Sequence, residues 1–166
     1  MERRCFEDFY RTYVKRVYKF VYFRIGSDKR LAEDLTQDVF LKAFEAFERY
    51  DPAVSQSSWI YTIARNHLIN HYAKTRPGVS LDDIEGSVWT SEDGRDRMIS
   101  RQDERHMLDA LARLPKEDAT LIRMKYLEGW AFEELAEIFG KSSGALRVQA
   151  GRAMKHLKTE MKKILL

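Results

Sequence analysis

The stretch that decides the fold runs over residues 127–161 and reads LEGWAFEELAEIFGKSSGALRVQAGRAMKHLKTEM. Its first half predicts a short helix, because four apolar residues recur at the i, i+3, i+4, i+7 spacing of one buried face. These residues are Phe132, Leu135, Ala136 and Phe139. Gly140 stands where a left-handed C-terminal cap belongs, so the helix ends there.

A second, longer helix follows after a turn at Lys141. Ser142 or Ser143 can cap its N-terminus. Four residues form a stripe that faces inward, with small side chains in the middle: Leu146, Ala150, Ala153 and Leu157. The opposite arc holds Gly144, Arg147, Val148, Gly151, Arg152 and Lys155. The whole stretch is therefore predicted to be a helix-turn-helix.

The end of the chain is strongly basic. From residue 141 onward there are seven Lys and Arg residues against one acid, Glu160, a distribution typical of phosphate binding. A solvated basic face is the alternative interpretation of this charge. The glycine, the short turn and the small inward residues favour DNA binding, because a recognition helix must pack closely and still protrude.

Length and composition set the broad class. The chain has 166 residues, of which 44% are hydrophobic and 33% charged, so we expect a folded protein with two small helical domains. No apolar run is long enough to cross a bilayer and the N-terminus lacks a signal-peptide core, so a cytoplasmic location without membrane insertion is expected. The single Cys5 excludes an internal disulfide. We expect neither a metal nor a cofactor.

The N-terminal part predicts two long helices. Aromatic and aliphatic residues repeat at helical spacing over residues 2–25, and a second helix, capped by Ser27 or Asp28, continues to about Arg49. Its predicted apolar arc holds Leu31, Leu35, Val39, Phe40, Ala43, Phe44 and Phe47.

A strip beside this arc holds Asp34, Gln37, Asp38, Leu41 and Glu45. An exposed leucine rimmed by carboxylates fits a docking surface for a basic partner helix; a solvated face is the alternative.

Residues 58–76 predict a helix without a single acid. Trp59, Thr62, Asn66 and Asn70 fall on one side, and the helix also carries Arg65, Lys74 and Arg76. Aromatic and amide groups on a cationic helix suit unstacked bases, because rings stack on bases and amides bind base edges. Trp59 could equally belong to the core. His67 and His71 lack a third metal ligand nearby, so we interpret them as structural or phosphate-facing.

An acidic linker is predicted next, at residues 77–104, with eight acids against three bases. Helical periodicity resumes near Arg105, pauses at Pro115 and continues to about Tyr126. These last helices are expected to supply the core that the helix-turn-helix cannot build alone.

Three separated stretches together resemble one family. DLTQDVFLKAF (residues 34–44), SWIYTIARNHLINHY (58–72) and LPKEDATLIRMKYLEGWAFEELAEIFGKSSGALRVQAGRAMKHL (114–157) are similar, in order and spacing, to the extracytoplasmic-function sigma factors of bacterial RNA polymerase. The resemblance implies an all-α fold with a region 2-like domain at residues 1–76, the linker at 77–104 and a region 4-like domain at 105–166.

The resemblance also implies the partners and their sites: core RNA polymerase, promoter DNA and an anti-sigma factor. The clamp helices of the largest polymerase subunit would dock on Asp34, Gln37, Asp38, Leu41 and Glu45. The melted minus-10 element would be read by Tyr50, Asn66 and Asn70, with Trp59, Thr62, Arg65, Lys74 and Arg76 nearby. The minus-35 duplex would be read by Arg147, Val148, Arg152 and Lys155, with Ser142 or Ser143 on a phosphate.

The chain departs from the family pattern at three places. Ala131 replaces a capping Ser or Thr, which weakens the start of the first helix of the motif by about 1 kcal/mol. Lys141 occupies a turn position that is usually apolar, and Gln149, Ala150 and Gly151 replace a bulkier, more basic run. The minus-35 sequence therefore cannot be transferred from relatives.

We therefore expect a promoter-specificity subunit with no enzymatic activity, since no glycine-rich phosphate loop, metal cluster or activated nucleophile is evident. A stand-alone helix-turn-helix repressor or activator is the alternative. An anti-sigma-type or scaffolding helical protein is a third, weaker alternative, which would not need a basic recognition helix.

Overall fold

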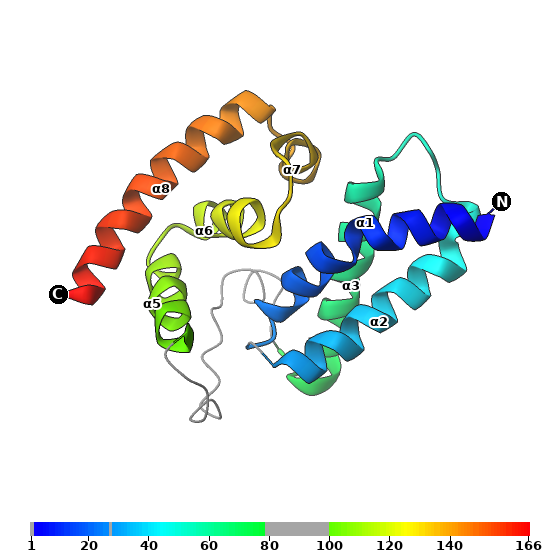
Figure 1. Ribbon diagram of the computed structural model, residues 1–166, viewed down its shortest axis with the longest axis horizontal. Helices are drawn as coiled ribbons and strands as arrows, with labels where there is room; N and C mark the ends of the chain where they lie inside the picture. The colour runs from blue at the N-terminus through cyan, green and yellow to red at the C-terminus, as the bar shows by residue number, and fades with distance from the viewer. Residues whose placement is uncertain (1, 27, 79–99) are drawn as a thin grey trace.

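The computed structural model describes residues 2–26, 28–78 and 100–166, and every regular element in these ranges is a helix. Figure 1 shows two groups of helices, α1 to α3 on one side and α5 to α8 on the other, with the two chain ends far apart. The predicted all-α fold of two helical domains is confirmed.

The N-terminal domain is a three-helix bundle of α1 (Glu2–Tyr22), α2 (Lys29–Ala46) and α3 (Gln56–Thr75). Asp28 caps α2 by accepting a hydrogen bond from the Leu31 amide at 3.1 Å, as predicted. A 3-10 turn, Phe47–Arg49, ends α2. Ser55 caps α3 in the same way, accepting from the Ser58 amide, so this helix begins two residues earlier than predicted.

The core of this domain lies where the three helices meet. Its fully buried members include Phe9, Val17, Phe20, Val21, Ala32, Val39, Ala43, Ile60 and Leu68. Burying each large apolar side chain contributes roughly 1.5–3 kcal/mol, which stabilises helices that are marginal alone. Phe44 corrects the predicted apolar arc of α2, because it is 50% exposed although one side of its ring packs edge-on against Phe6 of α1.

The C-terminal domain contains α5 (Ser100–Ala112), α6 (Lys116–Ile122), α7 (Phe132–Phe139) and α8 (Ser143–Leu165). Helix α6 continues into a π-helical turn, η2 (Arg123–Glu128), which ends at Gly129 with φ +85°. Only a residue that tolerates this left-handed conformation can turn the chain there, toward α7.

Helices α7 and α8 form the predicted helix-turn-helix. Gly140 has φ +65° and caps α7, and Ser142 accepts a hydrogen bond from the Ala145 amide at the start of α8. All four predicted inward residues of α8 are buried. Ala131 provides no side-chain cap, but the Glu134 carboxylate accepts a hydrogen bond from the Ala131 amide at 2.8 Å.

Helix α5 begins inside the predicted acidic linker. Its first residue is Ser100, so residues 100–104 of that linker are helical, while residues 79–99 lie outside the described residues. Helix α5 packs against α8.

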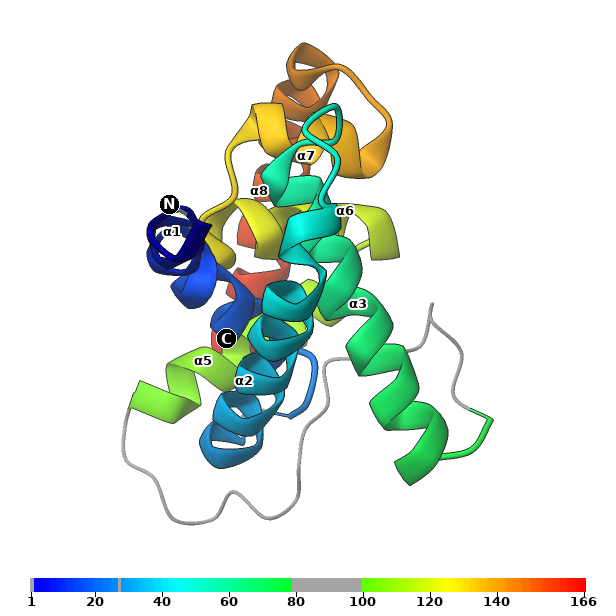
Figure 2. The same cartoon turned by 90° about the vertical axis from the view of Figure 1, so that its right-hand side faces the viewer.

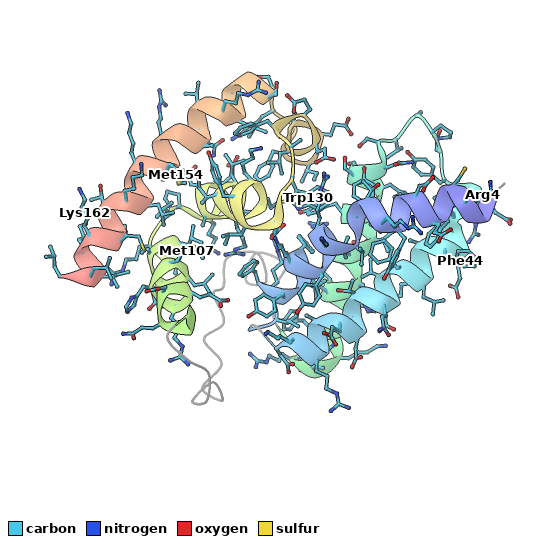
Figure 3. The ribbon with its side chains drawn as sticks, in the orientation of Figure 1. Arg4, Phe44, Met107, Trp130, Met154 and Lys162 are labelled. Atoms are coloured by element: carbon cyan, nitrogen blue, oxygen red, sulfur yellow. The ribbon has the colours of Figure 1, made fainter. Side chains whose placement is uncertain are left out.

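The two domains touch each other. Helix α1 packs against η2 and α3 packs against α7, and the view in Figure 2 places α7 beside the upper end of α3. Trp130, which follows η2, lies between the two groups of helices (Figure 3). None of the described helices is sufficiently long and apolar to span a membrane.

Candidate functional site

The predicted docking strip occupies an exposed face of α2. Asp34, Gln37, Asp38, Leu41 and Glu45 are all exposed. Leu41 is 57% exposed, and two further large apolar side chains are also exposed nearby: Phe44 at 50% and Tyr10 of α1 at 42%. A shallow hollow beside this strip is lined by Phe6, Glu7, Tyr10 and Phe44. Exposed apolar side chains rimmed by carboxylates are typical of a protein-binding surface.

The strip also touches the next helix. His67 of α3 is mostly buried, and its Nε2 lies 3.4 Å from the Asp38 carboxylate. Burial lowers the pKa of His67, Lys42 lowers it further, and Asp38 opposes both effects. Burial also lowers the pKa of His71. His67 thus joins α2 to α3, in agreement with the structural interpretation of this residue.

Helix α3 presents an exposed polar face to solvent. Thr62, Asn66 and Asn70 are exposed along one line, and Lys74 and Arg76 are exposed near its end. Within the described residues, no hydrogen bond joins the amide of Asn66 or Asn70 to another group. Both amides are therefore available to an external partner. Arg65 is half-buried.

Trp59 lies at the border between core and surface. It is half-buried, and its ring centroid lies 4.9 Å from Tyr50, 5.6 Å from Phe9 and 6.2 Å from Phe47. Tyr50 stacks on Phe47 and its hydroxyl donates to the Val54 carbonyl, so the loop before α3 is folded against this aromatic group. Trp59 therefore packs against the core residue Phe9 and also contacts Tyr50 of the preceding loop.

Helix α8 presents a cationic face. Arg147, Val148, Arg152 and Lys155 are exposed, together with Gly144 and Gly151, as the helical projection predicted. Ser142 is the capping residue, whereas Ser143 is half-buried in the first turn of the helix. In the part of the chain that the structure describes, no carboxylate pairs with Arg152 or Lys155.

Arg147 is held by two neighbours that the sequence analysis did not identify. Its Nη2 lies 2.7 Å from the Glu133 carboxylate, and its guanidinium lies over the Phe132 ring at 5.2 Å. The Glu133 carboxylate accepts hydrogen bonds from its own backbone N–H and from Arg147. Both bonds lower the pKa of Glu133, so the carboxylate stays charged. Both neighbours lie on α7, and no local sequence signal connects them with Arg147.

Gln149 and Lys141 form a second set of polar contacts on this domain. The Gln149 amide donates to Asp118 at 2.7 Å, and Lys141 contacts both Glu117 and the Gln149 oxygen. The two acids belong to the first turn of α6. Lys141 and Gln149, two positions at which the chain departs from the family pattern, therefore bind the acids in the first turn of α6.

Comparison with known proteins identifies the two domains. The family model of Sigma-70 region 2 matches residues 9–77, and that of Sigma-70 region 4 matches residues 105–157. The RNA polymerase sigma factor CarQ of Myxococcus xanthus is 31% identical over 157 residues, covering 93% of this chain and 87% of CarQ. The chain belongs to the extracytoplasmic-function sigma factors. The resemblance seen in the sequence is thereby confirmed, and the protein is a promoter-specificity factor of RNA polymerase.

Other sigma factors are similar over nearly the whole chain. YlaC of Bacillus subtilis is 29% identical, covering 97% of this sigma factor and 94% of YlaC. Two solved structures share the fold. RpoE of Bartonella quintana, solved with the anti-sigma factor NepR, has a TM-score of 0.64 at 22% identity, covering 96% of this chain and 98% of that one. CnrH, solved with the cytosolic domain of CnrY, has a TM-score of 0.60 at 19% identity, covering 97% and 90%.

Proposed function

We propose that this sigma factor divides promoter recognition among three surfaces: the α2 strip docks on core polymerase, α3 and its preceding loop bind the melted minus-10 strand, and α8 reads the minus-35 duplex. The observation that carries this division is that one small domain presents two different exposed faces. The α2 face combines Leu41 with four polar residues of acidic or amide type, and the α3 face combines amides with bases and no acid.

The α3 face fits single-stranded DNA by its chemistry. Extruding a base from duplex costs a few kcal/mol, which stacking on an aromatic ring and hydrogen bonds to the base edge offset. Tyr50 and Trp59 offer rings that lie together near the start of α3, and Asn66 and Asn70 offer free amides farther along the same helix. Lys74 and Arg76 continue the positive charge toward the helix end.

The α8 face fits duplex DNA. Arginine binds guanine edges through two parallel hydrogen bonds in the major groove, and Val148 can contact a thymine methyl group. Arg147 and Arg152 lie one and a half turns apart at most, so both can reach neighbouring bases while Lys155 contacts phosphate. Ser142, exposed at the helix N-terminus, is placed for a phosphate oxygen.

A repressor or activator that binds DNA alone is not favoured, because residues 9–77 match Sigma-70 region 2 rather than a separate sensing domain. We propose further that the protein catalyses no reaction itself, works in the cytoplasm with the polymerase, and is held inactive by an anti-sigma factor. RpoE, which shares its fold, was solved in complex with the anti-sigma factor NepR, which supports this last proposal.

The experiment that tests the docking surface is core polymerase binding by Asp38→Arg. The variant places a positive charge in the acidic strip, and we expect the affinity for core polymerase to fall about 100-fold or more while the circular dichroism spectrum is unchanged. Asp109→Arg is the matched control, because it makes the same charge change at an exposed aspartate of α5, in the other domain. Equal losses in both variants, or none in either, would remove the docking assignment.

A further inference from the structure

One side chain of α3 reaches the docking strip of α2. His67 is mostly buried, with 14% of its side chain exposed, and its Nε2 lies 3.4 Å from Oδ2 of Asp38, which is 57% exposed. The distance is long for a hydrogen bond, so the contact is mainly electrostatic. A carboxylate has two oxygens, and one can stay beside the ring while the other binds a partner.

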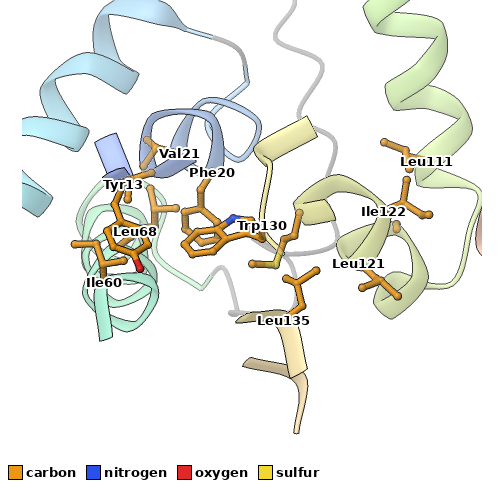
Figure 4. Packing of buried hydrophobic residues seen from close by; sticks show 14 of the residues in the cluster. Tyr13, Phe20, Val21, Ile60, Leu68, Leu111, Leu121, Ile122, Trp130 and Leu135 are labelled. Atoms are coloured by element: carbon orange, nitrogen blue, oxygen red, sulfur yellow. The ribbon is translucent and has the colours of Figure 1, made fainter. Parts of the chain in front are cut away.

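The packing of α3 fixes the position of this ring. Ile60, Ala64 and Leu68 are fully buried, and Figure 4 shows Ile60 and Leu68 on the side of α3 that faces the core. His67 precedes Leu68, so it lies about 100° around the helix from it, at the edge of the buried side and against α2. A rotation of α3 that withdrew the ring would also expose the core, which keeps the ring beside Asp38.

The surroundings of His67 favour its neutral form. Its Nδ1 is buried and has no hydrogen-bond partner among the described residues. A second proton would have to occupy this atom, because the neutral ring that faces a carboxylate carries its one proton on Nε2. Burial lowers the pKa of His67, Lys42 of α2 and His71 of α3 lower it further, and Asp38 raises it, with a net decrease. At neutral pH the negative charge of Asp38 is therefore left for an external partner.

A protonated ring would change the docking strip. An imidazolium beside Asp38 forms an ion pair with it and compensates the charge that attracts a basic partner helix. A bound basic partner in turn brings positive charge near the ring, which disfavours its protonation. Docking of the partner and protonation of His67 therefore oppose each other, as thermodynamic linkage requires.

We infer that His67 is a positioning residue of the docking strip: the neutral ring holds the Asp38 carboxylate for core polymerase, and the protonated ring withdraws it. The inference rests on the proposed function of the α2 strip. It adds that docking on α2 depends on pH through a side chain of the neighbouring helix.

Linkage gives the direction and the limit of this dependence. His67 gains a proton as the pH falls, so the affinity for core polymerase decreases from pH 8.0 to pH 6.0. A histidine with the ordinary pKa of about 6.5 would weaken docking at most about fourfold over this range. Because the pKa of His67 lies below that value, the expected contribution is about twofold.

The test measures the dissociation constant of the full chain and core polymerase at pH 6.0 and pH 8.0, by fluorescence anisotropy of a labelled chain. The polymerase also titrates, so the ratio of the two constants is compared between variants. His67→Gln keeps an N–H for Asp38 but cannot titrate. Its affinity at pH 8.0 should stay within about twofold of the wild type, and its ratio should be about twofold smaller.

His71→Gln is the matched control. His71 lies one turn farther along α3 and burial lowers its pKa too, but no carboxylate of the described residues pairs with it. This variant should keep the wild-type ratio. An equal change of the ratio in His67→Gln and His71→Gln would overturn the inference, as would a wild-type ratio in His67→Gln.

His67→Leu separates positioning from packing. Leucine fills the buried space without an N–H, so thermal stability should be equal or higher, while affinity at pH 8.0 should fall about threefold because the partner alone must immobilise Asp38. Lower stability with wild-type docking would mean that His67 only packs, and would overturn the inference. Wild-type docking by Asp38→Arg would instead refute the proposed function, and the inference with it.

Discussion

The two faces that meet DNA in our proposal, on α3 and on α8, differ in how firmly their polar side chains are held. On α8, Arg147 is fixed by Glu133 and Phe132, and Gln149 is fixed by Asp118. On α3, the side-chain amides of Asn66 and Asn70 make no hydrogen bond with the described residues. A duplex offers a rigid pattern that preset side chains can match, whereas an extruded base must be captured by groups that can still move.

Charge reversal on α8 should have the largest effect. We expect Arg152→Glu to weaken binding of the holoenzyme to minus-35 duplex by about 100-fold, because a phosphate or base contact is replaced by repulsion. Fluorescence anisotropy at several salt concentrations measures this loss and the change in salt dependence. Lys162→Glu makes the same charge change at the far end of α8. Equal losses in both variants would mean that α8 is merely a solvated basic face.

The amide of α3 should matter for opening rather than for duplex binding. We expect Asn66→Ala to slow formation of the open complex about tenfold, since one hydrogen bond to a captured base is lost. Permanganate reactivity of the minus-10 thymines measures opening, and a premelted minus-10 region should restore most of the rate. Thr75→Ala, on the other side of α3, is the control. A defect confined to duplex binding would contradict the division between the two faces.

Releasing Arg147 should have a smaller effect. We expect Glu133→Ala to lower affinity for the preferred minus-35 sequence about threefold, because an exposed ion pair contributes little energy and acts by orienting the guanidinium. The comparison with Arg147→Ala and with the double variant forms a double-mutant cycle. If the two substitutions prove additive in their effect on base preference, Glu133 does not position Arg147.

The smallest expected effect concerns pH and the α2–α3 contact. Burial lowers the pKa of His67 and His71, so the unfolded chain binds more protons than the folded one as the pH falls. Stability is therefore full above the unfolded value of about 6.5 and decreases as the pH falls below it. Thermal unfolding at about pH 7.5 and pH 5.5 should show a larger decrease for wild type than for His67→Gln. An identical decrease would remove His67 from this explanation.

Much of the fold follows from local sequence. Gly140, Ser142 and the spacing of Leu146, Ala150, Ala153 and Leu157 predicted the helix-turn-helix, and Asp28 predicted the start of α2. These features involve neighbours within a few residues, for which periodicity and capping are reliable signals. The exposed positions of the docking strip and of α8 were predicted for the same reason; their roles remain predictions.

The contacts between distant segments could not be predicted in this way. Arg24 and Glu128 form a buried ion pair although they are 104 residues apart, and nothing near either residue indicates the other. Phe44 contacts Phe6 of α1 and still leaves half of its surface exposed, a balance that the helical projection of α2 alone cannot show. The sequence does not distinguish Glu133 from the other acids of α7, because only the folded turn places it beside Arg147.

Run-off transcription with purified core polymerase tests the central claim most directly. Combined with core enzyme and a genomic library of promoter fragments, the wild-type chain should give discrete, promoter-dependent transcripts, and Asp38→Arg should give none. Asn66→Ala should lose most of its activity on intact promoters and regain it on premelted ones. Absence of any promoter-dependent transcript with the wild-type chain, or full activity of Asp38→Arg, would contradict the assignment of this protein's surfaces.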